Sequence, residues 1–109
     1  MREWFASLHA TNGGGGDDRL VGDTGRDRLE GKAGEDVLLG GKGRDLLRGG
    51  TDADRLRGGK GRDRLFGQSG PDRLFGDAGP DRLVGGAGID FGNGGRGRDV
   101  CKTEKRVRC

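Results

Sequence analysis

A nine-residue period runs through this chain without one insertion or deletion. Ten consecutive nonapeptides fill residues 13–102 of the 109-residue sequence, and each begins with glycine. Nine of the ten have glycine again at the fourth place, where Asp52 is the exception, and eight have leucine at the eighth place, from Leu20 to Leu83. All ten have aspartate at the sixth place: Asp18, Asp27, Asp36, Asp45, Asp54, Asp63, Asp72, Asp81, Asp90 and Asp99. So strict a period indicates one small unit stacked on itself, because a unit this short cannot bury its apolar side chain alone.

The consensus nonapeptide is G-x-x-G-x-D-R-L-x, and residues 58–66 follow it closely. We expect the glycines at the first and fourth places to adopt positive φ, so that the first six residues form a tight turn. Asp52 is compatible with the fourth place because aspartate enters the left-handed region more readily than most residues. The last three residues are predicted to form a short strand. Its leucine points inward, while the flanking side chains, Arg64 and Phe66 in this repeat, point outward.

The pattern resembles the repeats-in-toxin (RTX) nonapeptide G-G-x-G-x-D-x-U-x of the hemolysin-type calcium-binding region, in which U is a large apolar residue. The complete form, with the double glycine, occurs at residues 13–18, 40–45, 58–63, 85–90 and 94–99. The resemblance covers about five-sixths of the chain. It implies an all-β fold, a right-handed parallel β-roll (a β-solenoid) with two nonapeptides per coil and therefore about five coils.

The resemblance also implies a calcium site in each turn, completed by the turn of the next coil, two repeats away. All ten sixth-place aspartates would then be metal ligands, with Asp18 paired with Asp36, Asp27 with Asp45, and so on, which allows up to about eight Ca²⁺ ions. Carboxylates stacked roughly 4.8 Å apart repel by about 3 kcal/mol per pair at an effective dielectric near 20, and a divalent cation reverses the sign. Turn carbonyls supply further hard oxygens, which suit Ca²⁺ better than Mg²⁺ or Zn²⁺. The alternative is that each aspartate only hydrogen-bonds its own turn as an Asx motif.

The predicted core is thin. Only 28% of the residues are hydrophobic, whereas 36% are charged and 27 residues are glycine. Without the period, this composition would be typical of a disordered chain. Because eight leucines offset little of the backbone entropy of so glycine-rich a chain, we predict that the metal-free chain is disordered and that it folds on binding Ca²⁺.

Arginine is the second abundant feature. Lysine and arginine number 21 against 18 acidic residues, for a formal charge of +3. Many of the arginines occupy the seventh place, which faces outward: Arg19, Arg28, Arg55, Arg64, Arg73 and Arg82. They either decorate a solvated sheet surface or form a polyanion-binding face for anionic polymers or a cell surface, with no specific recognition of nucleic acid.

A metal-free solenoid is the third hypothesis, in which arginine neutralises the aspartate columns. Four repeats argue against this hypothesis, because they keep the aspartate although the seventh-place arginine is replaced by Val37, Leu46, Phe91 or Val100. An ice-binding surface, another metal-free solenoid, would need an outward ladder of threonines, which this sequence lacks.

Residues 1–12 lie outside the period and are interpreted as an N-terminal cap over the first coil. If they form a short helix, Trp4, Phe5 and Leu8 share one face. Residues 103–109 form a basic tail.

The cysteines are predicted to close that tail over the end of the roll. Cys101 occupies the inward eighth place of the last repeat, and Cys109 is the other cysteine of the chain. A disulfide between them would fit an oxidising compartment. The alternative is two free thiols, with Cys101 acting as a small hydrophobic residue.

The sequence contains no catalytic constellation, and we expect no enzymatic activity. His9 is the only histidine, tyrosine is absent, and no Gly-Lys-Ser/Thr run follows the glycine-rich stretches. No apolar run in the sequence is long enough for a secretory signal peptide or a transmembrane helix. Calcium dependence and the cysteines nevertheless predict a secreted or extracellular protein. The leading hypothesis is a monomeric calcium-binding β-roll with a structural or surface-interaction role.

Overall fold

The computed structural model describes the backbone of residues 2–5, 10–12, 16–86, 91–95, 100–102 and 106–108, and the side chains within residues 16–86 and 91–95. Every regular element in this part of the chain is a β-strand, and the strands form two sheets. The seven-stranded sheet contains the odd-numbered strands β1 (Arg2–Phe5), β3 (Asp18–Val21), β5 (Val37–Leu39), β7 (Arg55–Arg57), β9 (Arg73–Phe75), β11 (Phe91–Asn93) and β13 (Arg106–Arg108). The six-stranded sheet contains the even-numbered strands β2 (Ala10–Asn12), β4 (Arg28–Lys32), β6 (Leu46–Gly50), β8 (Arg64–Gln68), β10 (Arg82–Val84) and β12 (Val100–Lys102).

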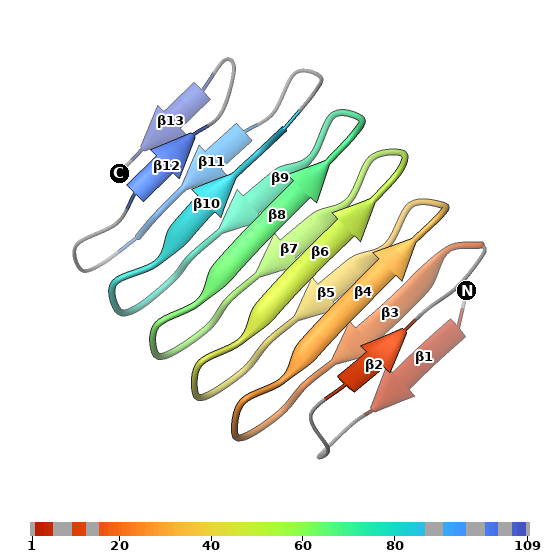
Figure 1. Ribbon diagram of the computed structural model, residues 1–109, viewed down its shortest axis with the longest axis horizontal. Coiled ribbons are helices and arrows are strands. Elements are labelled where there is room, and N and C mark those ends of the chain that lie inside the picture. The colour runs from red at the N-terminus through yellow and green to blue at the C-terminus, as the bar shows by residue number, and fades with distance from the viewer. Residues whose placement is uncertain are drawn as a thin grey trace.

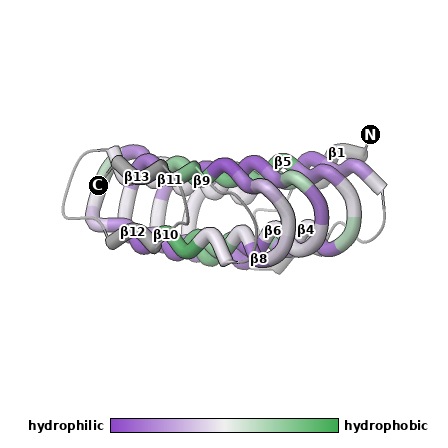
Figure 2. Tube along the Cα trace, turned by 90° about the horizontal axis from the view of Figure 1, so that it is seen from above, coloured by the Kyte–Doolittle hydropathy of each residue, from purple (hydrophilic) through white to green (hydrophobic). Residues whose placement is uncertain are grey.

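The chain winds from one sheet to the other as a right-handed parallel β-solenoid (Figure 1). Each nonapeptide contributes one strand, from β3 to β12, so two nonapeptides make one coil. Strand pairing is parallel, and Leu20 is in register with Leu38, which is in register with Leu56. Seen from above, the two sheets form two thin layers joined by turns along both sides (Figure 2). The predicted β-roll is confirmed.

The space between the sheets is filled by the leucines. All eight have no exposed surface: Leu20, Leu29, Leu38, Leu47, Leu56, Leu65, Leu74 and Leu83. The flanking side chains lie outside, as predicted, with Arg64 exposed and Phe66 half-buried. Because each strand from β3 to β10 buries one leucine, the core along these strands is one leucine wide in each sheet.

The turns depart from the prediction in where the chain has positive φ. The left-handed residues stand at the second and fourth places, not at the first and fourth. Second-place residues include Asp23 at φ 73° and Gly41 at φ 86°, and the fourth place includes Gly25 at φ 91°. Asp52, the non-glycine at the fourth place, has φ 71°, which confirms its predicted conformation.

The first-place glycine is required by space instead. A Cβ built on Gly40 would lie 2.6 Å from Oδ2 of Asp45 and 2.7 Å from the carbonyl oxygen of Gly58 in the next coil. Contacts this short exclude any side chain. Glycine therefore occurs at the first place because the aspartate of its own repeat fills the space beside it.

The described residues of the N-terminal segment, 2–5 and 10–12, form strands and not the helix considered for residues 1–12. Strand β1 continues one sheet, with Trp4 in register with Leu20, and β2 continues the other, with Thr11 in register with Leu29. A strand edge has unpaired N–H and C=O groups, and a further parallel strand satisfies them where a helix does not. Leu8 lies outside the described residues.

The C-terminal end is built in the same way. Strand β13, from the basic tail, pairs with β11 and places Val107 in register with Gly92. Cys101 lies in β12, in register with Leu83, whereas Cys109 lies outside the described residues, so the disulfide stays a prediction. None of the described residues belongs to a helix with the length and apolarity needed to cross a membrane.

Candidate metal-binding turns

The sixth-place aspartates stand where each turn meets its strand, and they form two buried columns. The odd column precedes the odd-numbered strands and contains Asp18, Asp36, Asp54 and Asp72. The even column precedes the even-numbered strands and contains Asp27, Asp45, Asp63 and Asp81. Each of these residues is at most 3% exposed. Asp90 and Asp99 lie outside the described residues.

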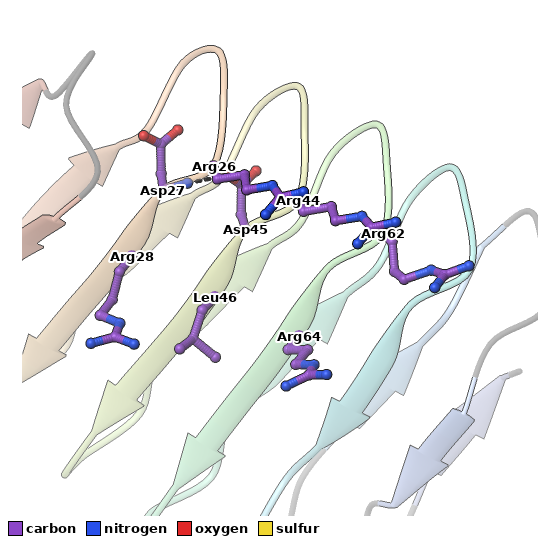
Figure 3. A pocket seen from close by; sticks show the side chains of 8 residues that line it. All are labelled: Arg26, Asp27, Arg28, Arg44, Asp45, Leu46, Arg62 and Arg64. Carbon is purple, nitrogen blue, oxygen red and sulfur yellow. Dashed lines mark hydrogen bonds between the residues drawn. The ribbon is translucent and has the colours of Figure 1, made fainter.

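Each column is connected by hydrogen bonds between successive coils. The backbone N–H of Asp18 donates to Oδ1 of Asp36 at 2.8 Å, and the N–H of Asp36 donates to Oδ1 of Asp54 at 2.9 Å. The even column repeats the pattern, with the N–H of Asp27 donating to Oδ1 of Asp45 at 2.9 Å (Figure 3). Partners are 18 residues apart, so the structure brings together the aspartates that the two-repeat pairing predicted. These bonds run between coils, unlike the within-turn bond of an Asx motif.

In part of each column the second carboxylate oxygen, Oδ2, accepts no hydrogen bond, and it is called the leftover oxygen below. Oδ2 of Asp36, Asp45, Asp54 and Asp63 is buried and accepts no hydrogen bond. A buried carboxylate oxygen without a partner is costly, and native structures rarely leave one unless an ion or a proton completes it.

A backbone carbonyl oxygen of the next coil lies near this leftover oxygen, beside the first-place glycine of the same repeat. Oδ2 of Asp45 and the carbonyl oxygen of Gly58 both approach the space that a side chain at Gly40 would fill. On the odd side, Oδ2 of Asp36 and the carbonyl oxygen of Gly49 approach the corresponding space at Gly31. A carboxylate oxygen beside a carbonyl oxygen of the next coil is a ligand combination that suits Ca²⁺.

No group of three or more His, Cys, Asp or Glu side chains within the described ranges is placed to hold one metal ion. This follows from the repeat, because each turn contributes a single sixth-place carboxylate. Any ion bound in a column would therefore be shared between two coils and would take its remaining ligands from backbone carbonyls.

Burial raises the pKa values of four aspartates in the columns. It raises the pKa of Asp36 to about 6 and that of Asp63 to about 8. The pKa values of Asp45 and Asp54 lie between these, at about 7. The backbone N–H that each carboxylate accepts lowers the pKa, and the neighbouring aspartate of the same column raises it. Without a cation, Asp45, Asp54 and Asp63 of the folded roll therefore hold protons near neutral pH.

The two edges of the roll, along which the turns lie, differ in charge. We define the even edge as places two to five of the turns before β4, β6, β8 and β10. It has five basic residues and two acidic residues, Arg26, Lys42, Arg44, Lys60 and Arg62 against Asp23 and Asp77. The odd edge is the same set of places before β3, β5, β7 and β9. Its described residues include three acidic residues and one basic residue, Asp17, Glu35 and Asp52 against Lys32.

The odd-edge acids take part in the turn structure beside the odd column. Oδ1 of Asp17 accepts the N–H of Glu35 at 2.8 Å, and Oδ2 of Asp52 accepts the N–H of Gly34 at 3.1 Å. The charges of Asp17 and Asp52 also add to the raised pKa of Asp36. The consensus nonapeptide hides this difference because it treats all repeats as equivalent. Reading alternate repeats separately at the fifth place would have found it.

Comparison with known families agrees with the geometry. The RTX calcium-binding nonapeptide repeat matches in four overlapping copies, at residues 12–47, 40–73, 48–83 and 66–101. Together these copies extend over most of the chain. No curated protein and no solved structure gives a significant match.

Proposed function

The chain belongs to the RTX calcium-binding nonapeptide repeat family, and on that premise we propose that it is a β-roll module that folds when Ca²⁺ binds. We further propose that it has a structural or surface-interaction role outside the cytosol, where calcium is plentiful. The observation that carries the proposal is the pair of buried aspartate columns with leftover carboxylate oxygens, seen at Asp36 and Asp54 on one side and at Asp45 and Asp63 on the other.

Within each column, successive aspartates would hold the ion between coils. In the odd column, Asp36 and Asp54 are already in contact through a backbone hydrogen bond, and each has a buried Oδ2 to contribute. Carbonyl oxygens near the first-place glycines complete a set of hard ligands. A bound calcium ion supplies the positive charge that lets neighbouring buried carboxylates remain ionised. By continuity of the repeat, the proposal extends to Asp90 and Asp99.

Folding on binding follows from the thin core. Eight leucines are the buried apolar side chains among the described residues, and they are packed around columns of carboxylates. Eight sites held at about ten times their Kd would contribute roughly 11 kcal/mol by mass action. That is of the order of a whole domain's stability, so calcium would decide whether the roll forms.

A chelator experiment tests this function. We expect a disordered far-UV circular dichroism spectrum in EDTA at pH 7.5 and a cooperative gain of β-structure in millimolar Ca²⁺. Mg²⁺ at the same concentration serves as the control and should be a poor substitute, because it demands tighter octahedral geometry. A β-sheet spectrum in EDTA at this pH would contradict the proposal.

The disulfide between Cys101 and Cys109 remains part of the proposed extracellular form. Strand β12 places Cys101 at the edge of its sheet, where a covalent link could hold the last coil. Intact mass without reductant should be two hydrogens below the reduced value. Alkylation of both thiols without reductant, after oxidative folding, would contradict it.

Polyanion binding is the second candidate function. The seventh-place arginines are exposed on both sheets, as the sequence predicted. Their rows are interrupted, however, by Val37 in one sheet and Leu46 in the other. The arginines at the turns form a better defined row.

A further inference from the structure

The even edge has a groove of about 510 Å³. Its lining residues come from three consecutive coils: Arg26, Asp27, Arg28, Arg44, Asp45, Leu46, Arg62 and Arg64. Figure 3 shows Arg26, Arg44 and Arg62 following one another along the turns, with Arg28, Leu46 and Arg64 on the strands beside them and Asp27 and Asp45 where the turns meet the strands. All five arginines are exposed. The groove therefore presents a dense row of guanidinium groups to solvent.

The roll itself creates this row. Arg26, Arg44 and Arg62 occupy the same place in alternate repeats and are 18 residues apart in sequence, whereas their coils lie roughly 4.8 Å apart. Residues 28, 46 and 64 are direct cross-strand partners below them. In an unfolded chain the same arginines would be dispersed, so a ligand that needs several of them at once requires the folded roll.

The acidic residues that line the groove are buried. Asp27 and Asp45 are each 3% exposed, and Oδ1 of Asp45 accepts the N–H of Asp27 inside the column. Calcium bound in this column, as the proposed function requires, would remove their remaining negative charge. The groove would then become more positive when calcium is present.

The opposite edge shows that this charge is not a general property of the fold. It has a groove of similar size, about 470 Å³. The fifth places that line this second groove are Asp17, Glu35, Ala53 and Pro71. Two edges built on the same backbone thus differ at the place where the even edge has arginine.

The lining of the even groove indicates the chemistry of its ligand. Each guanidinium can form two parallel hydrogen bonds to the oxygens of a phosphate group. No aromatic side chain lines the groove, and Leu46 is its single apolar residue, so it offers no surface on which a base or a sugar ring would stack. A ligand suited to this lining has closely spaced charges and no rings.

We propose that the even-edge groove binds a linear phosphate polymer through charge-assisted hydrogen bonds from its arginines. Binding is coupled to calcium because both the row of arginines and the neutral aspartate column depend on the calcium-bound roll. The inference rests on the proposed function for the folded state and adds a ligand to it.

A matched pair of triple variants tests the groove. Arg26→Gln, Arg44→Gln and Arg62→Gln together remove the turn row, whereas Arg19→Gln, Arg55→Gln and Arg73→Gln remove three exposed arginines from the odd-numbered strands. Both variants lose the same charge. The probe is end-labelled inorganic polyphosphate at nanomolar concentration, followed by fluorescence anisotropy in millimolar Ca²⁺. The turn-row triple should weaken binding at least about tenfold and should reduce the slope of log K against log salt concentration by about 2 in magnitude. The strand triple should weaken binding less than about threefold.

Four results would overturn the inference. Equal losses in the two triples would mean that net charge alone attracts the polymer. Tighter binding of heparin or of oligothymidylate than of polyphosphate would show that the groove recognises rings. Binding unchanged in EDTA would show that the arginines do not need the roll. Absence of binding by the unmodified protein, in a sample whose spectrum shows calcium-induced β-structure, would refute the groove and leave the calcium proposal intact, whereas absence of that β-structure would refute the calcium proposal first.

Discussion

The odd and even edges are two versions of one structure. Both have a buried aspartate column connected by hydrogen bonds between coils, and both have a first-place glycine pressed against the carboxylate. They differ in the exposed residues of the turn, where Glu35 on one side corresponds to Arg44 on the other. The first-place glycine, the sixth-place aspartate and, in eight of the ten repeats, the eighth-place leucine are restricted by packing, so they recur on both edges. The exposed places are free of that restriction, and their charge can suit each edge to a different ligand.

The largest effect should come from breaking a column in its middle. Oδ1 of Asp54 accepts the N–H of Asp36, and its own N–H donates to Asp72, so it faces partners on both sides. Asp54→Ala should lose up to about two calcium ions and divide the roll into shorter arrays that fold poorly. Asp18→Ala is the control, because Asp18 is first in its column and pairs only with Asp36 among the repeats, and it should lose about one ion.

Calcium bound per chain can be counted for both variants by calorimetry and elemental analysis. Asp63→Ala extends the comparison to the even edge, since Asp63 accepts from Asp45 and donates to Asp81 in the same way. It should behave as Asp54→Ala does. Equal losses from Asp54→Ala and Asp18→Ala would contradict shared sites and favour independent calcium loops.

The first-place glycines should respond alike on the two edges, because the backbone there is the same. A methyl group at Gly31 or at Gly40 would collide with Oδ2 of the aspartate in its own repeat. Gly31→Ala and Gly40→Ala should each cost about 1–3 kcal/mol by overpacking and raise the calcium midpoint measured by circular dichroism. Gly25→Ala is the control. Its Cβ would meet no atom within 4 Å, so it should cost only about 1–2 kcal/mol for the left-handed φ of 91°. A normal calcium midpoint for Gly40→Ala would contradict the crowded site.

The buried aspartates should also respond to pH, and not all at the same pH. The folded pKa of Asp63 in the even column is about 8, and that of Asp36 in the odd column is about 6, both above the ordinary value. A raised folded pKa favours the metal-free roll at low pH, and this contribution is lost as the pH rises from the ordinary value of 3.8 through the folded values of about 6 to 8. In EDTA, β-structure should therefore increase as the pH is lowered from about 8 to about 5. Calcium binding should instead weaken as the pH is lowered. Toward pH 6 the calcium concentration at the midpoint should rise, and more protons should be released on binding.

Calorimetry in buffers of different ionisation enthalpy measures the protons released. Near pH 7 the first ions should bind at Asp36 in the odd column, which is mostly ionised there, and binding at Asp63 in the even column should follow later, because Asp63 is mostly protonated. A calcium midpoint that does not change between pH 8 and pH 6 would rule out protonated columns in the metal-free roll.

Much of this architecture could be predicted from the period. Leucine at the eighth place indicated the inward side chain, aspartate at the sixth indicated the columns, and the conformation of Asp52 followed from its residue type. The role of the first glycine could not be predicted, because a sequence does not distinguish a glycine needed for positive φ from one needed for space. Strand β1 was missed because Trp4 is in register with Leu20, sixteen residues later rather than eighteen, so it is out of phase with the repeat. The charge of the edges was missed because one consensus averages over alternate repeats.

The smallest effect, and the sharpest test of the comparison, should come from neutralising the exposed acidic residues of one edge. Asp17→Asn, Glu35→Gln and Asp52→Asn together remove three negative charges beside the odd column. The amide oxygens of asparagine can still accept the N–H groups of Glu35 and Gly34, and asparagine tolerates the positive φ of Asp52, so the turns should keep their structure. Because these charges are exposed and attract a divalent cation from a short distance, their loss should weaken the first calcium-binding steps about two- to fivefold at low salt, and less at high salt.

The matched change on the even edge is the triple variant Arg26→Gln, Arg44→Gln and Arg62→Gln, which removes positive charge beside the even column and should tighten the later binding steps by a similar factor. Stepwise calcium titration by calorimetry at two salt concentrations distinguishes the two changes. If both triples shift calcium affinity in the same direction, the exposed charges of the turns do not set the difference between the edges. Opposite shifts that both shrink as salt is added would assign that difference to the residues at the second to fifth places of the turn, since the aspartate columns themselves are the same in the two variants.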